Sequence, residues 1–430
     1  MERNELMDQF INGTRPKIML WGIGSYAGSA MKTLAENGAE VCCYLTRDYG
    51  DYGPSLYGET FHFKEYPNPC PIIREKQIDL VIPMSINWHE AEWKDEFLEL
   101  QVPILSPYGA AIKLERDRNF GRLLAERYNV PVPEAHVAKN RLEALDYVRK
   151  NPKPYVIKNP LCAPGSPVHT IVTETVEDSF SWLEHVNYAE GVFLQEYMGR
   201  REAGHVAFVS NGDIYPLVTN QEYKRAFDGN MGPVAGAPMG GLVEVDLDDK
   251  YNIVKDTLEP LLPWFRESNF YGPVQSTCVK RDGRWHMIEY NVRTGITTGP
   301  ALCRMLENPV ETFLAVGHNR PVNVKFKPGY EYGCTLTLAG WGYPYTKIEG
   351  PFLTVQLNGE PTCDVWWNEV MADRHGRMLM SGHRVADVVA VGDTMQGAIQ
   401  QAYENIKKIY CLSSYYRLDI GASMWPPGEE

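Results

Sequence analysis

Long hydrophobic runs are missing from the sequence. In its 430 residues, no apolar stretch approaches the roughly 20 residues that a helix needs to cross a bilayer. Residues 1–10 are acidic and polar, whereas a secretory leader has a basic start and an apolar middle. We therefore expect a cytoplasmic protein without a membrane partner.

Paired cysteines are also missing. The nine cysteines are an odd number and include no Cys-x-x-Cys pair. This usage is typical of reduced, mostly buried thiols in a cytoplasmic protein and argues against a disulfide framework.

Positive charge is in deficit. The chain has 42 Lys and Arg against 55 Asp and Glu, which gives a net charge of −13. Affinity for nucleic acid comes largely from Lys and Arg, so we expect no nucleic-acid partner. The ten histidines have no metal-ligand spacing, and no Ser/His/Asp or Cys/His set indicates a nucleophilic enzyme.

What is present is the composition of an ordinary globular protein of two to four domains, 44% hydrophobic and 23% charged. The first 106 residues have the pattern of a doubly wound α/β domain. The predicted strands are residues 17–24, 39–45, 79–83 and 103–105, and a helix is predicted from Ser25 to about Asn37.

The first turn of this region carries Gly22, Gly24 and Gly28. Such a turn directs backbone N–H groups and a helix N-terminus at an anion, which leaves a dinucleotide-binding oxidoreductase open. The second strand, however, ends at residues 45–47 (LTR) without the acidic residue that holds a ribose.

Two polar side chains follow the strand at residues 79–83. Asn87 and His89 lie where open α/β sheets bind ligands, at the carboxyl ends of the strands. Both are candidates for that site, although an ordinary surface-loop position is the more common role for a histidine such as His89.

The middle of the chain predicts a strand-rich region with two helices. The helices pass through residues 117–128 and 142–150, and a polar loop is predicted at residues 220–233. The strands are predicted at residues 154–158, 168–172, 192–197, 203–209, 214–218, 271–279 and 284–292.

The last of these strands carries the strongest chemical signal. Strand alternation places Met287, Glu289, Asn291 and Arg293 on one face. Glu289 and Asn291 offer the hard oxygen ligands that Mg²⁺ takes beside phosphates, and Arg293 can fork onto a phosphate or carboxylate. A half-exposed edge strand with solvated polar residues is the alternative interpretation.

Lys158 gives a second signal. It ends a strand and precedes a loop of small and helix-breaking residues, 163–167 (APGSP), an arrangement with which several nucleotide sites cover a triphosphate. A solvated lysine at a strand end is the alternative.

Five separate segments together resemble an ATP-grasp ligase. They are residues 114–120 (LERDRNF), 156–158 (VIK), 195–197 (QEY), 224–236 and 288–293 (IEYNVR). Within that superfamily the chain resembles phosphoribosylamine–glycine ligase, the second enzyme of purine synthesis. Residues 223–233 (YKRAFDGNMGP) are similar to the family's H-K-R-x-x-D-x-D-x-G-P. Residues 339–344 (AGWGYP), 381–385 (SGHRV) with 391–394 (VGDT), and 416–421 (YRLDIG) resemble its A-G-G-Y-P, G-G-R-V…G-D-T and Y-R-x-D-I-G.

The resemblance implies a multidomain α/β and α+β fold. Residues 1–106 would be a doubly wound α/β domain, 107–308 the ATP-grasp domain with a lid at about 120–200, and 309–430 a small C-terminal α/β domain. It also implies an ATP-dependent ligase that joins a small carboxylate to a small amine through an acyl phosphate, uses Mg²⁺ or Mn²⁺, and is a monomer or homodimer.

The resemblance further assigns roles to residues of this chain. The implied metal ligands are Glu289 and Asn291, and the implied catalytic residues are Arg293, Lys224 and Arg225. The implied ATP-binding residues are Arg118, Lys158, Gln195, Glu196, Tyr197, Glu202 and Lys224. The implied substrate-binding residues are Gly24, Ser25, Tyr26, Asn87, Asp228 and Gly295.

The chain also departs from the family pattern. Residues 22–28 (GIGSYAG) lack the cation of the family's G-x-G-G-R-E-H-A, and residues 83–85 (PMS) replace its G-P-E. The loop 163–167 has no lysine, and residues 291–298 (NVRTGITT) have no acids. Three interpretations stay open: a paralogue with another amine, an authentic glycinamide ribonucleotide synthetase, and a nucleotide-binding protein without turnover. The sequence does not name the substrates.

Overall fold

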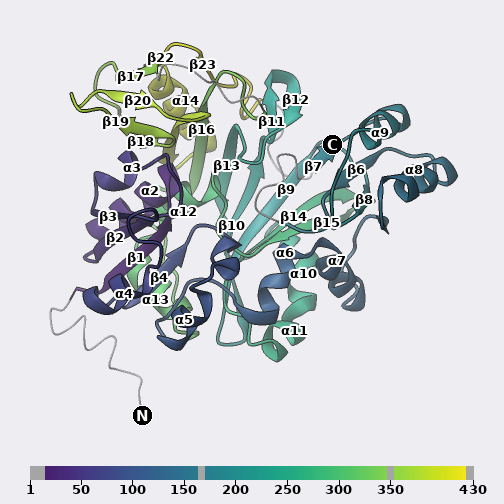
Figure 1. The fold of residues 1–430 in the computed structure, drawn as a ribbon, viewed down its shortest axis with the longest axis horizontal. Helices are drawn as coiled ribbons and strands as arrows, with labels where there is room; N and C mark the ends of the chain where they lie inside the picture. The colour runs from purple at the N-terminus through teal and green to yellow at the C-terminus, as the bar shows by residue number, and fades with distance from the viewer. Residues whose placement is uncertain (1–14, 163–169, 346–352, 423–430) are drawn as a thin grey trace. The chain divides into compact units, whose positions relative to one another are not determined.

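Two compact units make up the fold. Figure 1 shows the computed structural model, which describes residues 15–162, 170–345 and 353–422. The first unit comprises Met1–Ser106 and Ile296–Tyr416, and the second comprises Pro107–Gly295 and Arg417–Glu430. The three-domain division with a boundary near residue 308 remains a prediction.

The first unit begins with a parallel sheet in the order β3-β2-β1-β4. Its central strand is almost wholly apolar and buried, as a strand covered on both faces should be. The strands are β1 (Lys17–Gly22), β2 (Glu40–Leu45), β3 (Glu59–His62) and β4 (Leu80–Pro83), and the helices are α2 (Gly24–Glu36), α3 (Tyr52–Ser55), α4 (Cys70–Lys76), α5 (Lys94–Glu99) and the 3-10 turn η1 (Ile86–Glu90).

Two strand predictions in this sheet need correction. The strand predicted at residues 103–105 is only a single bridge between Val81 and Ile104. Strand β3 was not predicted, because its four residues (ETFH) carry only one fully buried apolar side chain, Phe61.

The C-terminal part of the first unit adds antiparallel strands. One group has the order β16-β21-β18 with β23 beside β16, and a second sheet has the order β19-β20-β17-β22. The strands are β16 (Tyr332–Gly340), β17 (Leu353–Leu357), β18 (Asp364–Trp367), β19 (Val370–Ala372), β20 (Met378–Met380), β21 (Arg384–Gly392), β22 (Ile409–Cys411) and β23 (Ser414–Tyr415), and the helices are α12 (Thr298–Met305), α13 (Pro309–Gly317) and α14 (Met395–Ile406).

Helix α2 packs against α12 and β18 within this unit. At the closest point, a Cβ on Gly299 would lie 2.6 Å from Cε2 of Tyr26, so only glycine allows the approach. The helix that follows the glycine-rich turn is therefore covered by Gly299, which lies 273 positions after Tyr26 in the chain.

The second unit is built on antiparallel strands in the order β15-β14-β9-β10-β13 (Figure 1). A smaller sheet has the order β5-β8-β6-β7 and packs under helices α8 and α9, with Ala144, Val148 and Leu183 in its core. The strands are β5 (Ala135–Ala138), β6 (Tyr155–Lys158), β7 (Thr170–Val172), β8 (Val192–Glu196), β9 (Glu202–Ser210), β10 (Asp213–Glu222), β11 (Arg225–Phe227), β12 (Met231–Val234), β13 (Gly240–Val245), β14 (Gly272–Arg281) and β15 (Arg284–Asn291). The helices are α6 (Lys113–Arg116), α7 (Arg118–Arg127), α8 (Arg141–Lys150), α9 (Val176–Leu183), α10 (Ile253–Thr257) and α11 (Leu262–Glu267), with 3-10 turns η2 (Gly109–Ile112), η3 (Asp228–Asn230) and η4 (Glu259–Leu261).

Two further predictions differ from the structure. The polar loop predicted at residues 220–233 is mostly strand, because β10 continues to Glu222 and β11 and β12 form a hairpin. The helix expected through Asp117 instead begins after it, since the Asp117 side chain caps α7 by accepting a hydrogen bond from Phe120 N at 3.0 Å. The small-residue loop 163–167 lies outside the described residues.

No helix among the described residues combines the length and apolar character that a bilayer crossing requires.

Candidate functional site

A β-bulge shapes the strand that carries the predicted metal ligands. In β15, Glu289 pairs with Thr277 and Met287 pairs with Cys278, so Ile288 is an extra residue in the ladder. Because paired residues share a face and successive residues alternate, the bulge puts Met287 and Glu289 on opposite faces. The predicted common face of residues 287–293 is therefore wrong for Met287.

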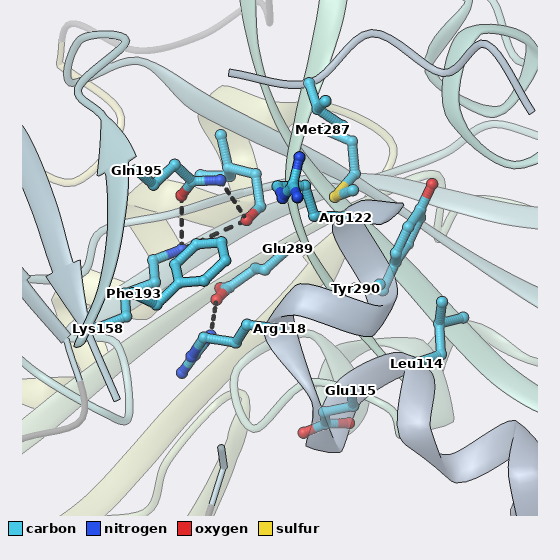
Figure 2. A pocket seen from close by; sticks show the side chains of 13 residues that line it. Leu114, Glu115, Arg118, Arg122, Lys158, Phe193, Gln195, Met287, Glu289 and Tyr290 are labelled. Atoms are coloured by element: carbon cyan, nitrogen blue, oxygen red, sulfur yellow. Dashed lines mark hydrogen bonds and ion pairs between the residues drawn. The ribbon is translucent and has the colours of Figure 1, made fainter. Parts of the chain in front are cut away.

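The bulge has a chemical consequence. The carbonyl of Ile288 accepts hydrogen bonds from Lys158 Nζ at 3.3 Å and from Gln195 Nε2 at 3.2 Å. Lys158 Nζ also donates to Gln195 Oε1 at 2.8 Å. Figure 2 shows this triangle on one wall of a pocket, which Arg118, Glu289 and Tyr290 also line. Three segments that lie far apart in the sequence are thus fixed at one point.

Glu289 is surrounded by cations. Its Oε1 lies 3.1 Å from Lys224 Nζ and its Oε2 lies 3.5 Å from Arg118 Nη1. Lys224 also pairs with Glu202 at 2.8 Å, and Arg118 donates to the carbonyl of Asn159 at 2.9 Å. Of the predicted ATP and metal residues, the structure therefore brings these four charged side chains together, with Lys158 nearby.

The pKa values follow from this crowding. Burial opposes ionisation of Glu289, but Lys224, Lys158 and Arg118 outweigh it and hold its pKa well below the usual range. Burial lowers the pKa of Lys158 to about 8, and the charges of Arg118 and Lys224 act in the same direction. Burial also disfavours the charge of Lys224, but Glu202 and Glu289 reverse this effect and raise its pKa.

Arg293 is held by a residue that the sequence reasoning did not assign. Glu115 accepts from Arg293 Nε at 3.1 Å and from the backbone N–H of Val292 at 2.7 Å. It is almost fully buried, so the pair fixes the end of the strand segment that follows Asn291. Glu115 lies inside the resembling segment 114–120, which was the available signal.

Two further implied ATP-binding residues, Glu196 and Tyr197, are also bonded within the unit. Glu196 binds Arg281 at 2.9 Å and Lys153 at 3.3 Å, and these cations outweigh burial and lower its pKa. The backbone N–H of Tyr197 donates to Pro154 O at 3.1 Å.

Arg225 contacts a carboxylate that was not predicted. Its Nη2 lies 2.9 Å from Glu174, which also forms a bidentate pair with Arg200. Burial works against a charge on this carboxylate, but the hydrogen bond from Arg200 is the larger effect and holds the pKa of Glu174 below its usual value.

Comparison with known proteins identifies the family. The family model of the phosphoribosylglycinamide synthetase ATP-grasp (A) domain matches residues 116–297, and the model of the phosphoribosylglycinamide synthetase C domain matches residues 333–423. The chain belongs to the phosphoribosylglycinamide synthetase family of ATP-grasp proteins.

Relatives in this family resemble most of the chain. The phosphoribosylamine–glycine ligase of Vibrio vulnificus is 28% identical over 76% of this chain and 79% of its own length. That of Vibrio parahaemolyticus is 27% identical over 86% and 88%, respectively. The solved phosphoribosylamine–glycine ligase of Thermotoga maritima is 22% identical, covers 94% of this chain and 99% of its own, and has a TM-score of 0.74, which shows the fold. A biotin carboxylase from Campylobacter jejuni, solved as a β,γ-ATP complex, is 12% identical over 94% of each chain, with a TM-score of 0.68.

The predicted substrate-binding residues of the family's first domain lie in packed surroundings. Ser25 donates its hydroxyl to Asp387 at 2.5 Å, and its N–H donates to Asn368 Oδ1 at 3.3 Å. Tyr26 is buried and packs on Gly299. Gly24 has the left-handed φ of +64°, and its N–H donates to Gly50 O at 2.8 Å.

The other predicted substrate residues are distributed over both units. The N–H of Asn87 donates to Ser85 Oγ at 3.4 Å in turn η1 of the first unit. Gly295 is buried just after Arg293 in the second unit. Asp228 accepts the backbone N–H of Leu418 at 2.7 Å. The substrate-binding roles that the family resemblance implies for these residues remain predictions.

Proposed function

We propose that the protein is an ATP-dependent ligase that joins a carboxylate to an amine through an acyl phosphate. The observation that carries this proposal is the cluster of three cations, Arg118, Lys158 and Lys224, around Glu289 beside a pocket. The names of the relatives and the ATP-analogue complex of the Campylobacter jejuni enzyme support it.

The residues fit ATP and a divalent cation. Arg118 and Lys158 line the pocket, and Lys224 pairs with Glu289 and Glu202 and interacts electrostatically with Glu222. Three cations are therefore available beside the pocket to the oxygens of a polyphosphate. Burial lowers the pKa of Lys158, so a bound anion would stabilise the charged form of this lysine. Glu289 and Asn291 would hold Mg²⁺ or Mn²⁺, which supplies charge neutralisation between phosphate oxygens.

The remaining chemistry belongs to residues of this chain. Lys158 and Arg118 would neutralise phosphate oxygens, while residues 195–197 and Glu202 would hold the base and ribose side of the nucleotide. Arg293, fixed by Glu115, would orient the substrate carboxylate as it takes the terminal phosphoryl group from ATP. The amine then attacks the acyl carbon and inorganic phosphate leaves, with Lys224 and Arg225 stabilising the developing charge.

Two substrate choices remain within this proposal. The relatives' names point to phosphoribosylamine and glycine. The turn at residues 22–28 has no cation, and Ser25 and Tyr26 bind within the protein, which favours another amine such as a nucleotide or sugar derivative. Charge-assisted bonds to phosphate are about twice as strong as neutral ones, so phosphoribosylamine should bind weakly at such a turn.

A coupled assay of ADP release tests both the ligase activity and the choice of amine. Phosphate release from ATP and Mg²⁺ that depends on an added amine and acid supports the ligase, whereas ATP binding without release in any pool identifies a nucleotide-binding protein. With phosphoribosylamine generated in situ and glycine, a kcat/KM of about 10⁴ M⁻¹s⁻¹ or more would establish the relatives' reaction and exclude the preference for another amine.

We further propose that the protein is cytoplasmic and acts as a monomer or homodimer. All nine cysteines are free thiols, which supports a reducing compartment. Sedimentation at micromolar concentration measures the oligomeric state.

A further inference from the structure

The residues around Lys224 form a hairpin with little support of its own. We call residues 224–234 the Lys224 hairpin; it comprises β11, η3 and β12. Only two residue pairs, Arg225–Val234 and Phe227–Met231, define its register. Phe227 and Met231 are 49% and 54% exposed, so these side chains build no core. An isolated two-stranded hairpin is marginally stable at best in water, and other contacts must therefore order it.

Arg225 contributes a pair with Glu174 and a hydrogen bond to Gly232 O, each at 2.9 Å. The other contacts come from residues 417–421, which we call the C-terminal strap. Asp228 Oδ1 accepts from Leu418 N at 2.7 Å, and Asp419 Oδ2 accepts from Gly229 N at 2.9 Å. Each segment thus offers a carboxylate to a backbone N–H of the other. Gly229 has a φ of +69°, a left-handed conformation that favours glycine, so the strap fixes the turn at its conformationally freest residue.

Arg417 connects this exchange to the residues next to Lys224. Its Nη1 donates to Arg225 O at 2.9 Å, and its Nε and Nη2 bind both oxygens of Asp419 at 2.8 and 2.7 Å. The guanidinium lies 5.1 Å from the ring centre of Tyr223, whose hydroxyl accepts from Gly421 N at 2.9 Å. Arg417 is only 1% exposed, so breaking these bonds would leave a buried charge unpaired.

The strap therefore contacts both neighbours of Lys224: it holds the backbone of Arg225 and the side chain of Tyr223. We propose that the C-terminal strap is a positioning device for Lys224, which keeps its ammonium between Glu202 and Glu289. Arg417 and Asp419 act through the hairpin and have no direct role toward a ligand. The expected effect on turnover rests on the proposed function. The expected effect on the order of the hairpin rests on the contacts alone.

The test uses Asp419→Ala, Asp228→Ala and the double variant in the full chain. The matched control is Asp373→Ala, because Asp373 also accepts two backbone N–H groups and pairs with an arginine, but lies in the first unit. Amide hydrogen exchange reports the order of the hairpin. Pulse acetylation reports the accessibility of Lys224, with the exposed Lys250 as internal reference. Turnover of ATP gives kcat and KM separately.

We expect exchange in residues 225–234 to accelerate at least about tenfold in each variant, with β9 and β14 unchanged. The double variant should exchange little faster than either single variant, because the loss of either bond releases the same strap. Acetylation of Lys224 should rise at least about fivefold relative to Lys250, and kcat should fall about tenfold or more with a smaller change in KM. The Asp373→Ala protein should match the wild type in all three measurements.

Unchanged hairpin exchange, or acceleration spread evenly over the second unit, would overturn the proposal. So would a loosened hairpin with unchanged acetylation of Lys224. If the alanine variants do not fold, Asp419→Asn keeps the shape and one acceptor oxygen and is measured in the same way. If the wild type shows no ATP turnover, the proposed function fails, and exchange with acetylation still decides the role of the strap.

Discussion

The two units each contain a cluster of charged side chains, and the clusters differ in whether they are sealed or border a pocket. In the first unit, Asp387 accepts from Ser25 at 2.5 Å, from Thr337 at 2.7 Å and from Arg384 Nη2 at 2.8 and 2.9 Å. The carboxylate of Glu369 also acts on Arg384, and Asp387 is 0% exposed. In the second unit, three cations meet three carboxylates, those of Glu289, Glu202 and Glu222, and the Glu289 side chain lines a pocket and is 24% exposed.

The difference separates two uses of the same residue types. A buried pair whose acceptor oxygens are all bonded has no capacity for a ligand and serves packing and orientation. A cluster whose cations line a pocket can exchange part of its carboxylate contacts for contacts with a bound anion. From this comparison we propose that the first-unit cluster is structural and that the second-unit cluster is the anion site. Variants of both clusters can test the structural role of the first and the anion-binding role of the second.

The largest effect is expected from Asp387→Ala. Removing the carboxylate leaves Arg384 buried without its counter-ion, which should cost about 3–5 kcal/mol of unfolding free energy. Urea unfolding measures the loss, and the paired change Asp387→Leu with Arg384→Met should recover much of it because no charge is left unpaired. A loss below about 1 kcal/mol in the single variant would contradict a sealed structural pair.

The next largest effect is expected from Glu289→Gln. ATP turnover should fall at least about 100-fold without unfolding, because the transition state loses its metal-bound charge partner, and Asn291→Ala should act in the same way. Phosphate release measures turnover. The control is Glu59→Gln, which breaks only a surface pair with Lys76. Near-wild-type turnover in both site variants would remove this assignment of the metal ligands.

A smaller effect is expected from Ser25→Ala. The variant loses a hydrogen bond to a charged group, which should lower the unfolding free energy by about 1.5 kcal/mol or more while KM for the amine stays unchanged. Chemical denaturation and steady-state kinetics are measured on the same preparation. If KM rises and stability is unaltered, Ser25 binds substrate as the family resemblance implies, and the comparison fails.

The smallest effect is a pH dependence of ATP binding. The pKa of Lys158 is lowered to about 8, and a bound phosphate should raise it again. Binding above pH 8 then requires proton uptake, so affinity is full below pH 8 and declines by at most tenfold per pH unit above it. Equilibrium binding between pH 7 and 9.5 measures the slope. Lys158→Arg, which stays charged, should remove it, and a flat wild-type profile would show that Lys158 is not at the phosphates.

Much of the second-unit cluster could be anticipated from the sequence. Arg118, Lys158, Lys224 and Glu289 come from four separate motifs, and the structure brings them together. Motifs of this kind are visible because each is a short run of adjacent residues. The parallel order of β1, β2 and β4 also follows from their apolar runs and the intervening helices.

Other features could not be anticipated, for physical reasons. Alternation cannot reveal the bulge at Ile288, since one extra residue changes the face of Met287 without changing the sequence pattern. The partner of Ser25 lies 362 residues later, and the partner of Asp228 lies 190 residues later. Local propensity contains no information on such distant pairs, so the sequence did not reveal these partners, and the substrate-binding roles that the family resemblance implies for Ser25 and Asp228 remain predictions.

The separation between the Lys224 hairpin and the C-terminal strap has a consequence for the newly made protein. Leu418 follows Asp228 by 190 residues. At a synthesis rate of about 5–20 residues per second, roughly 10–40 seconds pass between the appearance of the two segments. During that time the hairpin has no strap to bind. The ribosome therefore completes the first unit's sequence, which ends at Tyr416, before it makes the C-terminal strap of the second unit.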